Sequence, residues 1–254
     1  MSLKAQEASA GLTGRVTDVS GSPVPAAKVL VTDKERGTDW SVNTNEDGIY
    51  VFPRIPNGSY RVKVEAPGFK TFNQADLTLE LNQRARIDVV MQLGTVSESI
   101  EVTGDVALLQ TETTQVGAIV TEKTIDETPL ISRNLVALTL LIPGVTATDP
   151  QSFTTGTRAE SSGGRPYVNG NREQANNFLL DGIDNNQLSD NLSPYQPSPD
   201  AVQEMKVITN NASAEFGNFQ GGVMNVVLKS GTNRLRGTLF ESARNDFFNA
   251  NNWA

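Results

Sequence analysis

Residues 203–233 read QEMKVITNNASAEFGNFQGGVMNVVLKSGTN. Two runs rich in β-branched and apolar residues, 205–209 and 223–229, are typical of strands, and the segment between them is rich in turn residues. The pattern therefore predicts a hairpin-like pair of strands. Gly221 and Gly222 stand just before the second run, where glycine permits close backbone packing or a positive φ. Such a pair of strands is common in α/β domains, so the pattern of strand-like runs and turn residues does not by itself identify a family.

Composition excludes several classes of function. The chain has 254 residues, which leaves room for about two domains, because a domain typically takes ~100–200 residues. Its formal net charge is −8 and it contains no Lys/Arg-rich run, so nucleic acid is not an expected partner. It contains neither Cys nor His, which excludes disulfides, thiol nucleophiles, His-based triads and the usual zinc ligand sets. The sequence shows no transmembrane-length apolar run and no signal-peptide core in residues 1–10, which we expect to form a tail.

The first module reads as short strands separated by turn residues, which favours a β-sandwich. Alternation is clear at Tyr60, Val62 and Val64, whose neighbours are polar, as expected for a sheet with one buried face. The same two-residue period predicts core positions at Leu77, Leu79, Leu81, Ile87, Val89, Met91 and Leu93. The expected strands are 11–18, 27–33, 40–44, 50–53, 59–66, 76–81 and 84–93.

The turns of this module carry a family resemblance. Five motifs occur in order: Gly14-x-Val16-x-Asp18, Pro23-Val-Pro-x-Ala27-x-Val29, Asp47-Gly-x-Tyr-x-Phe52, Pro56-x-Gly-x-Tyr60 and Ala66-Pro-Gly-Phe69. They resemble the carboxypeptidase regulatory-like domain over residues 11–94, and the resemblance implies a seven-stranded, transthyretin-like β-sandwich with a carbohydrate-binding-like fold. A structural role in turns accounts for most of these residues. Peptidase activity is not implied, because no zinc-binding His is present.

The second module alternates strand and helix signals. Residues 116–120 read as a strand and 121–126 as a polar helix or turn. Ser132 is a candidate N-cap for an apolar helix that ends at Pro143-Gly144. Its expected buried stripe is Leu135, Leu138, Leu141 and Ile142.

Residues 165–172 and 176–184 look like two paired strands, with Asp181-Gly182 as a turn. Oxygen ligands that suit calcium occur nearby, but their spacing fits no EF-hand loop. We therefore expect turn capping by these side chains, and no metal or cofactor. The side chains concerned are Asp181, Asp184, Asn185, Asn186 and Asp190.

The motifs of this module resemble the plug of TonB-dependent outer-membrane receptors, in the Oar-like group that carries a sandwich extension. The motifs are PLxxRN at 129–134, LxPGV at 141–145, NGxR at 169–172, LDGxD at 180–184, and AEFG, GGVMNVV and KSGTN within 203–233. The resemblance implies a mixed α/β plug over 105–233, so the chain is expected to be mainly β with an α+β second domain. Residues 234–254 resemble the start of the receptor barrel, whose remainder is missing here; a barrel needs at least eight strands.

Residues 95–104 link the two modules and contain a segment that looks like a TonB box. That segment comprises Glu98, Ser99, Ile100, Glu101, Val102 and Thr103. An extended stretch of this kind can add to a partner's sheet edge through main-chain hydrogen bonds. The residues alone equally allow the last strand of the sandwich followed by a linker. The position directly before a plug-like region favours the box.

Together these resemblances imply a non-enzymatic role as the periplasmic extension and plug of a TonB-dependent transporter. The expected location is the periplasmic side of the outer membrane, with this chain itself soluble. The implied partners are a TonB-type energy-coupling protein, the receptor's own barrel and a transported substrate of unknown identity. Loops 146–165 and 185–199 are candidates for substrate contact, on polarity and plug topology.

An alternative from another class is a cell-surface carbohydrate- or protein-binding module. Its candidate contacts are the aromatic residues Trp40, Tyr50 and Phe69, because exposed rings can stack on sugars. An enzyme is the third interpretation. Carboxylate pairs such as Asp181 and Asp184 exist, but nothing places them about a scissile bond.

Overall fold

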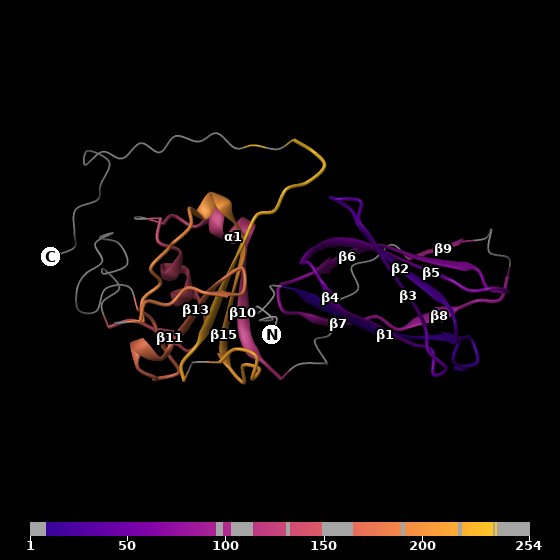
Figure 1. Ribbon diagram of the computed structural model, residues 1–254, viewed down its shortest axis with the longest axis horizontal. Coiled ribbons are helices and arrows are strands. Elements are labelled where there is room, and N and C mark those ends of the chain that lie inside the picture. The colour runs from indigo at the N-terminus through magenta and orange to yellow at the C-terminus, as the bar shows by residue number, and fades with distance from the viewer. Residues whose placement is uncertain are drawn as a thin grey trace, which may run out of the picture.

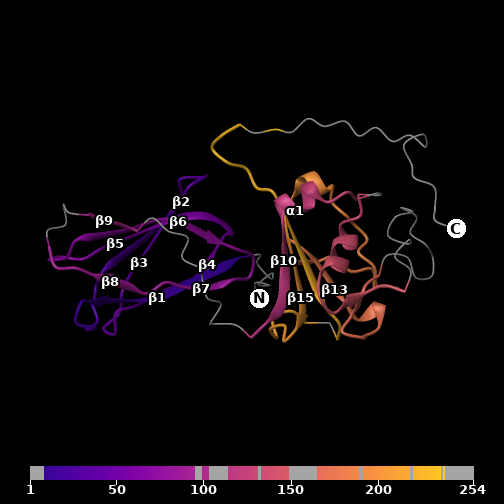
Figure 2. The same cartoon turned by 180° about the vertical axis from the view of Figure 1, so that it is seen from behind.

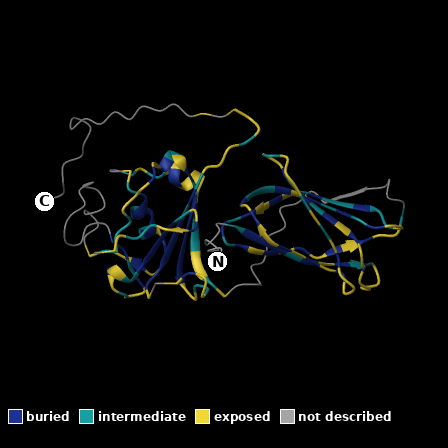
Figure 3. Cartoon of the chain, viewed as in Figure 1, coloured by how far each residue is buried: buried dark blue, intermediate teal, exposed yellow. Residues whose placement is uncertain are grey.

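The computed structural model describes residues 9–94, 99–102, 114–130, 133–148, 165–188, 191–217, 220–235 and 237. These residues form two bodies that lie end to end, a β-sandwich and a mixed α/β body (Figure 1). Buried residues run through the interior of each body (Figure 3). Over the described ranges, the structure has no helix with the length and apolar character needed to cross a membrane.

The first body is built from two sheets. One has the order β4-β1-β7, with β8 also paired to β1, and the other has the order β3-β2-β5-β6-β9. The strands are β1 (Ala10–Asp18), β2 (Lys28–Asp33), β3 (Asp39–Asn43), β4 (Ile49–Ile55), β5 (Gly58–Glu65), β6 (Thr71–Leu79), β7 (Arg84–Arg86), β8 (Val89–Met91) and β9 (Ser99–Val102). The predicted β-sandwich is confirmed.

The predicted strand 84–93 is two strands, β7 and β8, both parallel to β1. The ladder is interrupted because the carboxylate of Asp88, rather than a main-chain carbonyl, accepts the Arg15 amide at 2.9 Å. The predicted core is confirmed with one exception. Leu93, which lies beyond β8 in an isolated bridge with Phe69, is 70% exposed.

The second body has a sheet of order β10-β15-β16-β13-β14 and a small sheet of β11 and β12. The predicted pair within 203–233 is confirmed: β15 and β16 are antiparallel, with Met205 opposite Val226. The segment predicted to be a polar helix or turn is a helix, and Thr121 caps it. The elements are β10 (Val116–Thr121), α1 (Glu122–Glu127), β11 (Val145–Thr146), β12 (Tyr167–Val168), β13 (Asn177–Leu180), β14 (Ile183–Asp184), β15 (Val202–Asn210) and β16 (Val223–Leu228).

Two predicted strands of this body do not pair with each other. Residues 165–172 contribute β12, which pairs with β11 instead. Residues 176–184 contribute β13 and β14, and β13 also runs parallel to β16. The 3-10 turn Glu173–Ala175 separates the two segments and diverts the chain between sheets. The predicted turn at Asp181-Gly182 is present, with positive φ at both residues.

The predicted apolar helix is a 3-10 helix, η1 (Leu135–Leu141), which Asn134 caps by accepting from the Val136 amide at 3.0 Å. Ser132, the predicted cap, lies outside the described residues. With about three residues per turn, positions 136, 139 and 142 form one row, and that row is buried beside Leu135 and Leu138. Leu141, predicted to be buried, lies in the last turn and is 60% exposed.

Candidate functional site

The segment that resembles a TonB box lies mostly on β9, at the edge of the five-stranded sheet. β9 runs parallel to β6, with Ser99 opposite Thr71 and Val102 opposite Gln74. Within the described residues, β6 is its only neighbour in the sheet. The backbone of 99–102 is therefore placed as a last strand of the sandwich. Glu98 and Thr103 lie outside the described residues.

The turn that follows β6 reaches the second body. There the Glu204 carboxylate on β15 accepts a hydrogen bond at Oε1 from the Leu81 amide at 2.9 Å. The same oxygen accepts from Asn57 Nδ2 at 2.6 Å. Two residues along β15, Lys206 Nζ donates to the Leu81 carbonyl at 3.1 Å and to the Asn82 carbonyl at 3.2 Å. We call these four contacts the β15 clamp.

Both charged side chains of the β15 clamp are buried, with residue exposures of 9% for Glu204 and 6% for Lys206. Burial raises the pKa of the Glu204 carboxyl to about 7. The hydrogen bonds from the Leu81 amide and the Asn57 side chain act in the opposite direction and lower this pKa. Burial likewise lowers the pKa of the Lys206 ammonium, while nearby carboxylates oppose that shift. Sequence reasoning missed this pair. The available signal was two charges at alternate positions of a strand whose neighbouring residues Met205, Val207 and Ile208 are apolar, since alternate positions lie on one face.

A second contact joins the β2–β3 turn to the residues that follow β16. The Glu35 carbonyl accepts from the Asn233 amide at 3.2 Å, and the Arg36 carbonyl accepts from the Asn233 side chain. Arg36 also donates to Ser230 Oγ. Asp33 organises this turn, accepting at Oδ1 from the Glu35 amide at 2.8 Å. Opposite views agree that one end of the sandwich adjoins the second body near β10 (Figures 1 and 2).

Gly221 and Gly222 serve close packing, and neither adopts a positive φ. A Cβ at Gly221 would lie 2.5 Å from Asn176 Oδ1, and one at Gly222 would lie 2.9 Å from Val168 Cγ2. Asn176 is fully buried. It donates from Nδ2 to the Pro166 carbonyl at 2.7 Å and accepts at Oδ1 from the Gly222 amide at 2.9 Å. This asparagine therefore joins three segments of the second body.

The suspected carboxylates and amides support turns. Asp181 Oδ1 accepts from the Leu228 amide at 3.0 Å, and Asp184 Oδ1 accepts from the Asn186 amide at 3.0 Å. Asn185 Nδ2 donates to the Tyr195 carbonyl at 2.8 Å. Asp190 lies outside the described residues. In the parts of the chain that are described, no cluster of three or more Asp, Glu, His or Cys could hold a metal ion.

The three suspected aromatic residues do not form one exposed platform. Tyr50 on β4 is 1% exposed and donates from its hydroxyl to the Ile87 carbonyl at 2.8 Å, so its ring is not accessible to a sugar. Trp40 on β3, in the other sheet, is half-buried and meets Tyr60 edge-on, with ring centroids 5.9 Å apart. Phe69 is also half-buried and packs on the core. The suggested role of Tyr50 in sugar stacking is therefore wrong.

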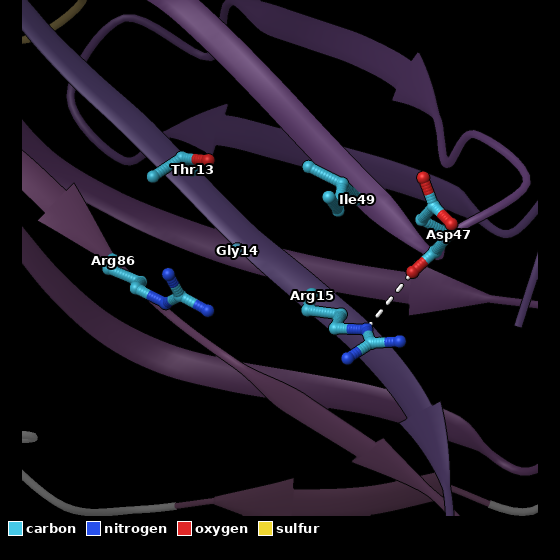
Figure 4. Close-up of a pocket in the computed structure, with 6 residues that line it drawn as sticks. All are labelled: Thr13, Gly14, Arg15, Asp47, Ile49 and Arg86. Atoms are coloured by element: carbon cyan, nitrogen blue, oxygen red, sulfur yellow. Dashed lines mark hydrogen bonds between the residues drawn. The ribbon is translucent and has the colours of Figure 1, made fainter. Parts of the chain in front are cut away.

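A hollow of about 370 Å³ lies on the first sheet of the sandwich, lined by Thr13, Gly14, Arg15, Asp47, Ile49 and Arg86 (Figure 4). The guanidinium groups of Arg15 and Arg86 both interact with neighbouring residues. Arg15 Nε donates to the Asp47 carbonyl at 3.0 Å, and Arg86 forms an ion pair with Asp88 at 3.1 Å. We assign no ligand to it.

The two loops predicted to contact substrate are described unevenly. Residues 149–164 of the first loop lie outside the described residues. In the second loop, Asn185 Nδ2 donates a hydrogen bond to Ser193 Oγ at 2.9 Å, and Tyr195 is 58% exposed. Their role in substrate contact stays a prediction, as do the domain boundaries. Residues 234–254 fall almost entirely outside the described part of the chain.

Comparison with known proteins matches each body to a family. The model of the carboxypeptidase regulatory-like domain matches residues 11–92, and that of the TonB-dependent receptor plug domain matches residues 110–223. The TonB-dependent transporter Oar of Myxococcus xanthus is 26% identical over 242 residues, covering 91% of this chain and 21% of that protein. Carboxypeptidase Z of Rattus norvegicus is 37% identical over 87 residues, covering 34% of this chain and 13% of that protein.

Among solved structures, the siderophore receptor PirA of Pseudomonas aeruginosa is 24% identical and covers 46% of this chain and 19% of that one, with a TM-score of 0.35. The chain spans about a fifth of the transporter's length and about an eighth of the carboxypeptidase's. Two family models in the expected order, and one relative matched along nearly the whole chain, agree. The chain therefore matches a carboxypeptidase regulatory-like domain over residues 11–92, followed by a TonB-dependent receptor plug domain over residues 110–223, and is similar along most of its length to a TonB-dependent transporter.

Proposed function

We propose that this chain is the periplasmic extension and plug of an outer-membrane transporter, and that it gates substrate uptake by energy coupling to the inner membrane. The observation that carries the proposal is the similarity to a TonB-dependent transporter along 91% of the chain, together with the match to the plug family over residues 110–223. The plug closes the lumen of its barrel until it is displaced. The work is mechanical, and no covalent step is required of these residues.

In this scheme, residues 98–103 are the strand on which a TonB-type protein pulls. Strand addition relies on main-chain hydrogen bonds and needs little specific side-chain chemistry. Support comes from the position of β9 at a sheet edge, where one ladder, to β6, holds residues 99–102. A partner strand has two ways to bind there. It either adds to the outer edge of β9 or replaces β6 as its neighbour.

The test is a calorimetric titration of this chain, and of its Ile100→Pro variant, with a purified TonB-type periplasmic domain. Proline removes the main-chain donor and is poorly accommodated in a paired strand. We expect micromolar binding that Ile100→Pro abolishes. The matched control is Ser41→Pro in β3, the strand at the opposite edge of the same sheet, which should leave binding intact.

Two results would refute the proposal. One is the absence of binding to several TonB-type domains, and the other is equal loss of binding in both proline variants of folded protein. Saturable glycan binding that Trp40→Ala abolishes, with no affinity for any TonB-type domain, would favour a surface recognition module instead.

A further inference from the structure

Strand β6 pairs with the candidate partner-binding strand, and the turn that follows β6 contacts the plug. Its first half pairs with β9, from Thr71 opposite Ser99 to Gln74 opposite Val102. Its other end, at Leu79, leads directly into the turn whose Leu81 and Asn82 bind Glu204 and Lys206 of the plug. One continuous strand therefore lies between residues 99–102 and the plug's β15.

The β15 clamp has the chemistry of a firm attachment. A buried carboxylate faces two sandwich donors, and a buried ammonium faces two sandwich carbonyls. Hydrogen bonds to charged groups are stronger than those between neutral groups, and breaking such contacts without solvent leaves buried charge unpaired. Separation of the two bodies at this point is therefore costly until water enters.

A second contact between the two bodies lies away from the β15 clamp and opposes rotation about it. Glu35 and Arg36 of the β2–β3 turn bind Asn233, and Arg36 also binds Ser230. These plug residues follow β16 and lie on a different element from Glu204 and Lys206. Two attachments on different elements restrict the relative movement of the two bodies more than one attachment does.

We propose that β6 provides a second, noncovalent route for force between residues 98–103 and the plug, in parallel with the covalent chain that leads from residue 103 into the plug. The route runs from β9 across its ladder to β6, along β6 to the turn at 80–83, and through the β15 clamp into β15. Because β15 is paired with β10 on one side and β16 on the other, force that arrives there loads an interior strand of the plug sheet. This inference rests on the proposed function only for the source of the force.

A single-molecule pulling experiment on the whole chain tests the route without any TonB protein. The sequence contains no cysteine, so handles can be attached specifically through Thr103→Cys, just beyond β9, and Lys123→Cys on α1 of the plug. We expect a discrete lengthening when that route breaks and the covalent chain takes up the load.

Two variants should abolish the lengthening step for different reasons. Ile100→Pro breaks the ladder between β9 and β6, and Lys206→Met removes the ammonium from the β15 clamp. The matched control is Lys229→Met, the same change at a plug lysine whose ion pair with Glu122, at 2.8 Å, is partly exposed. This control should keep the step.

The proposal is wrong if the parent chain extends smoothly, or if folded Lys206→Met keeps the step. Should Lys206→Met fail to fold, Asn57→Asp attacks the β15 clamp from the sandwich side by placing a second carboxylate against Glu204, and a step that survives it refutes the route. Failure of the proposed function is distinguishable. A chain that shows the step but binds no TonB-type domain keeps the mechanical link and loses its partner.

Discussion

Asn57 and Glu204 are 147 positions apart in the chain, yet Asn57 Nδ2 donates to Glu204 Oε1 at 2.6 Å across the junction of the two bodies. Asn57 is a turn residue of the sandwich, and Glu204 belongs to the plug's β15. Both residues are buried. Their contact means that the two domains share a polar interface in addition to the linker.

Glu204 should make stability depend on pH. Its folded pKa, about 7, lies above the ordinary 4.5, so the folded state holds the proton between those values and the unfolded state releases it. The stabilising contribution is complete below pH 4.5 and is lost as the pH rises through 7. In the parent chain we expect the unfolding free energy to fall by on the order of 1–3 kcal/mol between pH 4.5 and 7.5. In Glu204→Gln this fall should be absent.

Urea unfolding at the two pH values measures this effect. Glu122→Gln is the matched control, because that carboxylate is 52% exposed and pairs with Lys229 at the surface. Its pH dependence should match that of the parent chain. An unchanged decline in Glu204→Gln would contradict the prediction.

Lys206→Met should loosen the two bodies without unfolding either. The change removes the donor to the Leu81 and Asn82 carbonyls while conserving side-chain length. Spin labels at Ser41→Cys on β3 and Lys123→Cys on α1 should report one narrow distance distribution in the parent chain and a broad one in Lys206→Met. Lys229→Met should resemble the parent, and a parent distribution that is already broad would contradict the rigid interface.

Gly221→Ala should destabilise the plug locally. The added Cβ would lie 2.5 Å from Asn176 Oδ1, a contact that forces a shift of a fully buried side chain. We expect a loss of about 1–3 kcal/mol, measured as faster hydrogen exchange of the β13 and β16 amides. Gly217→Ala is the control, because a Cβ there meets no atom within 4 Å. Equal exchange rates in the two variants would contradict this account.

Tyr50→Phe should weaken the sandwich but bind sugars no differently from the parent. It removes the hydroxyl that donates to the buried Ile87 carbonyl at 2.8 Å, which should cost about 1–2 kcal/mol. Urea unfolding followed by tryptophan fluorescence measures the change, since Trp40, one of the two tryptophans, packs on the sandwich core. Thr32→Val, which removes an exposed hydroxyl bonded to Asp39 at 2.6 Å, serves as a surface comparison and should cost less.

Local sequence patterns correctly predicted the elements that depend on residues close together in the chain. The two-residue period placed Tyr60, Val62 and Val64 in the core, and Asp181-Gly182 forms the turn its residues favour. The pair of β15 and β16 was also predictable, because both strands carry strong apolar runs on either side of turn residues. The parallel pairing of β13 with β16 was not, since a strand's own sequence does not encode which neighbour lies beside it.

The sequence by itself determined a β-sandwich followed by a mixed α/β body, because alternation, turn chemistry and apolar period act over a few residues. Only the tertiary structure decided that residues 99–102 lie on β6, and that Glu204 and Lys206 meet the turn beyond it. Those contacts join segments up to 125 positions apart. Most of the groups that Glu204 and Lys206 bind are main-chain amides and carbonyls, which are present at almost every position of any sequence. The sequence therefore does not indicate which of these groups are bound, and the packing of the folded chain decides it.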